Sequence, residues 1–153
     1  ARALLSGTRE MKRYMSLDLG DATIGVAVSD LLGLTAQGVE TVRRTTLEAD
    51  IARLGQLMQE YEVDALVAGL PKHMNGDEGE RCSIVRAFMA EVEEHFPRTE
   101  VHYWDERLST VAASRALIAG DVSRKKRRKV IDKMAAVYIL QGFLDRQNMG
   151  NHG

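Results

Sequence analysis

Hydrophobic and polar residues alternate with a period of two over the first third of the chain, which is the pattern of half-buried strands. Three such segments follow one another, at about residues 13–20, 23–30 and 34–42. Short turns containing glycine join them, and the first turn holds Gly20 and Asp21. Strands joined in this way pair antiparallel, so the pattern predicts a three-stranded meander.

The period then changes to that of an amphipathic helix. Thr45 and Glu48 fit a capping box at its start. The apolar positions that follow at helical spacing are Leu47, Ile51, Leu54, Leu57, Met58 and Tyr61. A compact apolar run at residues 64–71, ended by a proline, then predicts a buried strand.

The rest of the chain alternates helix with strand. A second helix is expected around residues 84–92, a fifth strand at 101–106, a third helix from 109 to about 120, and a last, strongly apolar helix at 130–147. Helical crossovers between strands are right-handed and make those strands parallel. The predicted fold class is therefore α/β, with a five-stranded mixed sheet of three antiparallel strands and then two parallel ones, flanked by helices.

Length and composition support one globular domain. The 153 residues are 44% hydrophobic and 28% charged, which is ordinary for a soluble domain with its own core. We expect a flexible lead over residues 1–12, a single domain over 13–147 and a flexible tail over 148–153. The first ten residues lack the apolar core of an export signal. The apolar stretch at 134–140 is too short to span a bilayer.

Cys82 is the only cysteine, so the chain forms no intrachain disulfide and no thiolate zinc cluster. A reducing compartment fits this composition, and we expect a cytoplasmic protein.

The net charge of −1 hides a polarised distribution. Six consecutive cations leave 15 basic residues against 22 acidic ones elsewhere, a charge of −7. A dense basic segment on an acidic body predicts a phosphate-binding footprint, although a solvated loop is the alternative. The candidate nucleic-acid-binding residues are Arg124, Lys125, Lys126, Arg127, Arg128 and Lys129, followed by Lys133.

Acidic residues stand at the ends of two predicted strands. Alternation in the first strand places Met15, Leu17 and Leu19 on one face and Tyr14, Ser16 and Asp18 on the other. A buried carboxylate is costly unless it has a partner or a metal. Asp105 and Glu106 lie on opposite faces of the fifth strand, and alternation alone does not choose between them. Asp132 is expected near the start of the last helix, where the helix dipole favours an ionised carboxylate.

Carboxylates from three separate elements repel one another unless divalent cations hold them together. Mg²⁺ and Mn²⁺ prefer oxygen ligands, and two such ions about 3.5 to 4 Å apart can activate a water and stabilise the leaving oxygen in phosphodiester cleavage. Each acid also has an ordinary explanation, since an aspartate at a strand end is often a turn former and Asp132 can be a simple helix charge. His73 is read as a loop residue that could flank the site, and His95 and His102 as structural.

Five segments of the sequence together resemble the YqgF/RuvX family, a relative of the Holliday-junction resolvases within the ribonuclease H-like superfamily. They are "SLDLGDATIGVAVSD", "AQGVETV", "VAGLPKHMNGDEGERC", "YWDERLST" and "IDKMAAVYILQGFLD", which span about residues 13–145 in order. The resemblance implies a ribonuclease H-like fold and a nuclease that processes a precursor of 16S rRNA in ribosome biogenesis. Branched DNA is the alternative substrate.

The resemblance also implies the site residues. The family's catalytic and metal-binding acids fall on Asp18, Glu106 and Asp132, with Mg²⁺ or Mn²⁺ as cofactor in a two-metal site and nucleic acid as partner. One departure stands out, because residues 21–23 are Asp, Ala and Thr where many members carry basic residues. This difference shifts the expected substrate contacts toward residues 124–129.

Two other functions compete with this reading. A nucleic-acid-binding module without catalysis needs only the basic segment. The segment "DLGDATIG" also resembles the phosphate-binding hairpin of sugar kinases and actin-like ATPases, but those proteins enclose ATP between two lobes and this chain has the length of one. The choice of RNA or DNA, the mode of cutting and the formation of a homodimer stay open at this point.

Overall fold

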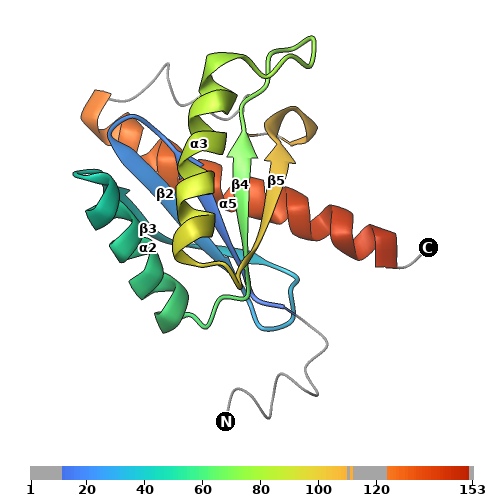
Figure 1. Cartoon of the computed structure of the whole chain (residues 1–153). Coiled ribbons are helices and arrows are strands. Elements are labelled where there is room, and N and C mark those ends of the chain that lie inside the picture. The colour runs from blue at the N-terminus through green and yellow to red at the C-terminus, as the bar shows by residue number, and fades with distance from the viewer. Residues whose placement is uncertain (1–11, 110, 112–123, 152–153) are drawn as a thin grey trace.

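A computed structural model gives the structure of the chain and describes residues 12–109, 111 and 124–151, without the side chains of 124–133 and 151. Its centre is a five-stranded sheet in the order β3-β2-β1-β4-β5 (Figure 1). The strands are β1 (Tyr14–Leu19), β2 (Thr23–Ser29), β3 (Ala36–Arg43), β4 (Ala65–Leu70) and β5 (Glu100–Asp105).

Strand pairing follows the predicted pattern. β1 pairs antiparallel with β2, and β2 pairs antiparallel with β3, with a register shift between Val26 and Ala27. β4 pairs parallel with β1 on one side and with β5 on the other. The mixed sheet is thus confirmed. Because β1, β4 and β5 are parallel, their carboxyl ends meet at one edge of the sheet, and this edge carries the candidate site.

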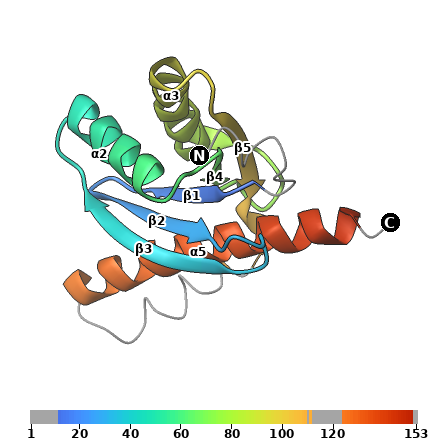
Figure 2. The same ribbon diagram turned by 90° about the horizontal axis from the view of Figure 1, so that it is seen from below.

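Helices cover both faces of the sheet. α2 (Leu47–Glu60) and α3 (Gly79–His95) lie on one face, and α5 (Arg124–Asn151) crosses the other, as Figure 2 shows. A short 3₁₀ helix, η1 (Glu106–Leu108), directly follows β5. None of the described helices is long and apolar enough to cross a membrane.

Each face of the sheet has its own apolar core. Leu17 of β1 and Leu66 of β4 pack with α2 and α3, whereas Tyr14, Val67 and Trp104 pack with α5. This division follows the period-two alternation of the strands, and it confirms the predicted faces of β1.

The start of α2 differs from the prediction. Thr46, not Thr45, is the N-cap, and its hydroxyl accepts from the amide of Ala49 at 3.1 Å. The carboxylate of Asp50 accepts from the amide of Thr45 at 2.9 Å and from Nε of Arg44 at 3.3 Å. The buried Asp50 therefore satisfies the amide that precedes the cap, a role that the spacing of Thr45 and Glu48 concealed.

The last helix is longer at both ends than the sequence suggested. α5 begins at Arg124, so the basic segment 124–129 has a helical backbone and is not a loop before the helix. At the other end the helix continues to Asn151, through residues assigned to a tail, and the side chain of Asn148 donates to the carbonyl of Gly33 at 3.1 Å. The predicted helix at 109–120 and the predicted lead fall mostly outside the described residues.

Candidate functional site

Asp18 lies at the carboxyl end of β1 and points to the face that α5 covers. It alternates with Leu17 and Leu19, which belong to the opposite core. Two residues before it, the hydroxyl of Ser16 donates to the carbonyl of Ala136 on α5 at 2.6 Å. Asp18 is 5% exposed, so this carboxylate is held at the interface between the sheet and α5.

Glu106 comes to the same face from the end of β5. Gly69 of β4 is the neighbour of Asp18, because Leu17 and Ala68 pair one residue earlier in the parallel register. A Cβ at Gly69 would stand 2.7 Å from Oε2 of Glu106 and still closer to Cδ1 of Ile139 on α5. The glutamate carboxylate, 4% exposed, therefore lies over a glycine that makes room for it, beside the strand that carries Asp18.

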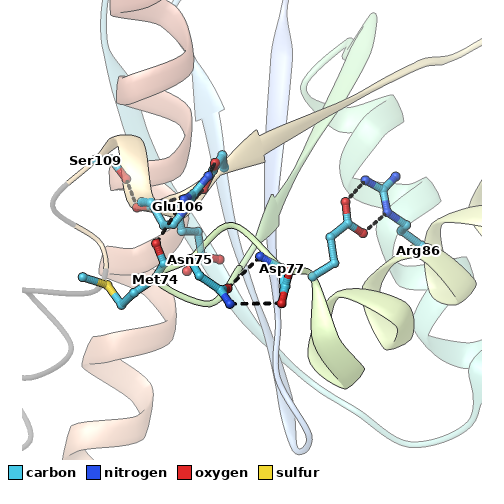
Figure 3. Close-up of polar contacts among 9 residues, drawn as sticks. Met74, Asn75, Asp77, Arg86, Glu106 and Ser109 are labelled. Carbon is cyan, nitrogen blue, oxygen red and sulfur yellow. Dashed lines mark hydrogen bonds and ion pairs between the residues drawn. The ribbon is translucent and has the colours of Figure 1, made fainter.

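The backbone of Glu106 is also fixed. Its carbonyl accepts from the amide of Ser109 at 3.3 Å and from the hydroxyl of Ser109 at 3.1 Å. That hydroxyl in turn accepts from the indole of Trp104 at 3.2 Å. Figure 3 shows the contact between Glu106 and Ser109. The turn after β5 thus sets the direction of the glutamate side chain.

Asp105 lies on the other face. It pairs with Leu70, which belongs to the core under α2 and α3. The guanidinium of Arg107 donates to its carboxylate, with Nη2 to Oδ2 at 2.7 Å, and this hydrogen bond lowers the pKa of Asp105 below its ordinary value. The choice between the two adjacent acids that alternation left open thus has a geometric answer: Glu106 shares a face with Asp18.

Asp132 lies inside α5, and this corrects its predicted place. The helix begins eight residues earlier, at Arg124, so Asp132 is outside the first turn where the helix dipole acts. Its backbone position is four residues, or about one helical turn, before Ala136, which contacts Ser16 of β1. The side chains of Asp132, Lys133 and the basic segment 124–129 fall outside the described part of the structure.

The turn after Asp18 is held by two arginines from other elements. Nη1 of Arg44 donates to the carbonyl of Gly20 at 2.7 Å, and Nη2 of Arg81 on α3 donates to the carbonyl of Leu19 at 3.3 Å. Arg81 also forms an ion pair with Asp21 at 2.8 Å. A cation therefore stands at this turn, supplied by α3 and paired with an exposed acid.

The three histidines among the described residues have structural surroundings. His73 lies in the loop after β4, where its ring packs against Gly79. Nδ1 of His95 lies 2.9 Å from the carbonyl of Glu91, and the ring of His102 contacts those of Tyr14 and Phe143. Within the described residues, no three His, Cys, Asp or Glu side chains gather as a metal site, and the side chain of Asp132 lies outside that set.

Gly69 and Arg107 lie beside the candidate site, and the sequence reasoning assigned neither of them to it. A signal for Gly69 was present, since a glycine inside an apolar strand often marks a close approach of another group. Arg107 had no comparable signal, because its contact with the carbonyl of Met74, in the loop after β4, joins residues 33 apart in the sequence.

Comparison with known proteins agrees with this architecture. Residues 12–146 match the family model described as "RuvX: Holliday junction resolvase". The chain belongs to the RuvX family. Relatives from Heliobacterium modesticaldum and Desulforamulus reducens are each 56% identical over 133 residues, which are 87% of this chain and 89% and 96% of theirs. A relative from Clostridium beijerinckii is 54% identical over the same length. The names of all three designate them as inferred pre-16S rRNA nucleases.

Solved structures of Thermus thermophilus RuvC resemble the fold of this chain. One, determined in complex with a Holliday junction substrate, has a TM-score of 0.56 at 11% identity and covers 92% of this chain and 97% of its own. Another has a TM-score of 0.52 at 12% identity and covers 89% and 96%. At such low identity the likeness establishes a shared ribonuclease H-like fold.

Proposed function

We propose that this RuvX-family chain is a divalent-metal-dependent nuclease that processes the precursor of 16S rRNA in the cytoplasm. The observation that carries the proposal is the burial of two carboxylates, Asp18 and Glu106, on one face of the sheet and at the same edge. Two acids buried at one edge of a sheet are typical of sites that do chemistry. The names of the curated relatives support the choice of RNA.

The residues fit a site for Mg²⁺ or Mn²⁺. Carboxylate oxygens are the ligands that these ions prefer, and Gly69 leaves space over the strand for the Glu106 carboxylate. Asp18, Glu106 and Asp132 would hold the ions. The backbone of Asp132 supports this assignment, because it lies about one helical turn before Ala136, whose carbonyl accepts from Ser16 of β1. Bound ions would supply an activated water and stabilise the leaving oxygen.

The chain's own groups bind and orient the substrate. The basic segment 124–129 and Lys133 precede or flank Asp132 on one helix, so a phosphate backbone drawn to these cations is brought toward the carboxylates. The hydrogen bond from Ser109 to the carbonyl of Glu106 keeps this residue in place while the nucleic acid binds. The scissile phosphate then lies at the sheet edge, between the strand ends and α5.

A second candidate is cleavage of branched DNA, which the description of the family model favours. A junction resolvase makes paired nicks and needs two sites, so it would act as a homodimer. Trimming of an RNA end needs one site. The molecular mass of the protein in solution is therefore measured together with its substrate preference, to distinguish a homodimer from a monomer.

The test is a cleavage panel with the full chain. Single-stranded RNA bearing the end of 16S rRNA, single-stranded DNA, duplexes and a four-way junction are incubated with Mn²⁺ and with EDTA. We expect cleavage of the RNA with Mn²⁺ only, and Asp18→Asn should lower it at least about 100-fold while binding in EDTA stays within about twofold. The matched control is Asp21→Asn, three residues away and 91% exposed, which should still cleave. Cleavage by Asp18→Asn at the wild-type rate would remove the proposal, and preference for the junction would favour the second candidate.

A further inference from the structure

The loop between β4 and α3, residues 71–78, begins at the same sheet edge as the buried acids and is not explained by the proposed chemistry. Its tip carries Met74, whose exposed fraction of 92% is the highest among the exposed large hydrophobic residues of the described chain. In Figure 3 Met74 lies next to the turn that carries Glu106 and Ser109. Met74 is thus an apolar side chain that stands in water beside the candidate active site.

The loop has a defined internal structure. The amide of His73 donates to the carbonyl of Asp77, and the amide of Gly76 donates to the carbonyl of His73, each at 2.9 Å. Asn75 and Asp77 add two hydrogen bonds of 3.0 Å through their side chains. Gly76 has a φ of 97°, which favours glycine. These contacts hold the residues around Met74 in one conformation.

Arg107 ties this loop to the end of β5. Its Nη1 donates to the carbonyl of Met74 at 3.3 Å, while Nη2 and Nε hold the carboxylate of Asp105. The guanidinium also lies against Gly76, where a Cβ would stand 3.5 Å from Nη1. Since Arg107 directly follows Glu106 in the chain, the tip of the loop has a fixed position relative to the buried carboxylate.

Several of the charges around the tip are paired. Arg107 holds Asp105, Arg86 holds Glu78 at 2.7 Å, and the amide of Asn75 donates to Asp77. Both arginines beside the tip are therefore engaged by acids, and the cation that the loop itself carries is Lys72. The exposed thioether instead matches the flat, uncharged face of a nucleobase, against which apolar side chains, methionine included, pack when they wedge between bases.

We propose that Met74 stacks on a nucleobase of the bound strand, next to the phosphate that lies at Asp18 and Glu106. The inference rests on the proposed function, because it assumes that a nucleic-acid strand binds at this edge of the sheet. Arg107 acts as a positioning residue, because it holds the backbone of Met74. The stacked group is the base face, which RNA and DNA share, so the contact itself favours no base sequence.

The test uses binding without turnover. In EDTA, the affinity of the full chain for single-stranded RNA and for the same strand as DNA is measured by anisotropy. Contact with a base removes the apolar surface of Met74 from water, so Met74→Ala should weaken binding about 5- to 100-fold, and Met74→Leu should restore most of the loss. The control is Met149→Ala at the far end of α5, where the side chain is also largely exposed at 75%. This control should bind as the wild type does.

A fluorescent base analogue locates the contact. With 2-aminopurine placed at successive positions of the strand, the wild type should change the emission at one or two neighbouring positions, and Met74→Ala should abolish that change. Arg107→Gln should weaken it, with no further loss when combined with Met74→Ala. Wild-type affinity and an unchanged emission profile in Met74→Ala would overturn the inference. A chain that binds and shows the Met74 signal but never cleaves would contradict the proposed function alone.

Discussion

The carboxylate of Glu106 lies over Gly69, in space that any other side chain on that strand position would fill. Oε2 is 2.7 Å from the place of a Cβ, and Cδ1 of Ile139 closes the other side. A glycine in the middle of the sheet costs stability as a rule, since it packs nothing and gains backbone freedom on unfolding. At this position the glycine leaves room for the carboxylate of Glu106 beside Asp18. The candidate site therefore accounts for a glycine that lowers the stability of the sheet.

Gly69→Ala should therefore damage cleavage more than it damages the fold. The added methyl group must displace Glu106 or Ile139, and overpacking of this kind destabilises by about 1–3 kcal/mol. We expect kcat to fall at least about tenfold at a temperature where the variant is fully folded. Thermal unfolding followed by circular dichroism gives that temperature, and cleavage of the RNA substrate gives kcat.

Gly55→Ala is the control for this prediction. A Cβ at Gly55 would stand 2.9 Å from the ring of Phe96, on the other side of the molecule from Glu106. It should lower the melting temperature by a similar amount and leave kcat unchanged. Equal losses of kcat in both variants would mean that Gly69 matters for packing alone.

The basic start of α5 should dominate the salt dependence of binding. Neutralising Lys125, Lys126 and Lys129 together removes three cations that release counterions from the nucleic acid. The slope of log K against log salt should become shallower by about 0.7–0.9 for each phosphate that the variant no longer neutralises. Arg98→Gln, an exposed cation in the loop before β5, should leave the slope as it is. An unchanged slope in the triple variant would place the binding surface elsewhere.

Stability should depend on pH through Asp105. Arg107 holds the folded pKa of Asp105 below its ordinary value of 3.8, so the ionised form is bound more tightly in the folded state. The stabilisation is present above the unfolded pKa and is lost as pH falls through the folded pKa. The melting temperature of Asp105→Asn should thus lie below that of the wild type by a constant amount above about pH 5, and the gap should narrow below about pH 4. If the difference in melting temperature were as large at about pH 2 as at about pH 5, the ionised Asp105 would not be its cause.

Much of the fold followed from periodicity, because each strand and helix buries its own apolar face. The mixed sheet of three antiparallel and two parallel strands, the faces of β1 and the place of Asp18 were predicted correctly for this reason. The start of α2 was wrong by one residue, because two adjacent threonines both fit a cap and the buried Asp50 decides between them. The predicted start of α5 at residue 130 was also wrong. A run of six cations has no apolar face, so its sequence does not distinguish a helix from a solvated loop.

The site itself was only partly predictable. Asp105 and Glu106 are adjacent, and the register of β5 against Leu70, not the local pattern, separates their faces. Arg107 and Met74 meet through a loop 33 residues away in sequence, which no local pattern reports. The place of Asp132 shows the same limit, since its expected position depended on where the helix began.

The adjacent acids provide the most direct test of the central claim, that the carboxylates on the α5 face perform cleavage. Glu106→Gln and Asp105→Asn remove one charge each from neighbouring residues on opposite faces of the sheet. Single-turnover cleavage of the RNA substrate with Mn²⁺ should fall at least about 100-fold in Glu106→Gln and stay within about threefold of the wild type in Asp105→Asn. Retained cleavage in Glu106→Gln, or loss confined to Asp105→Asn, would contradict the claim.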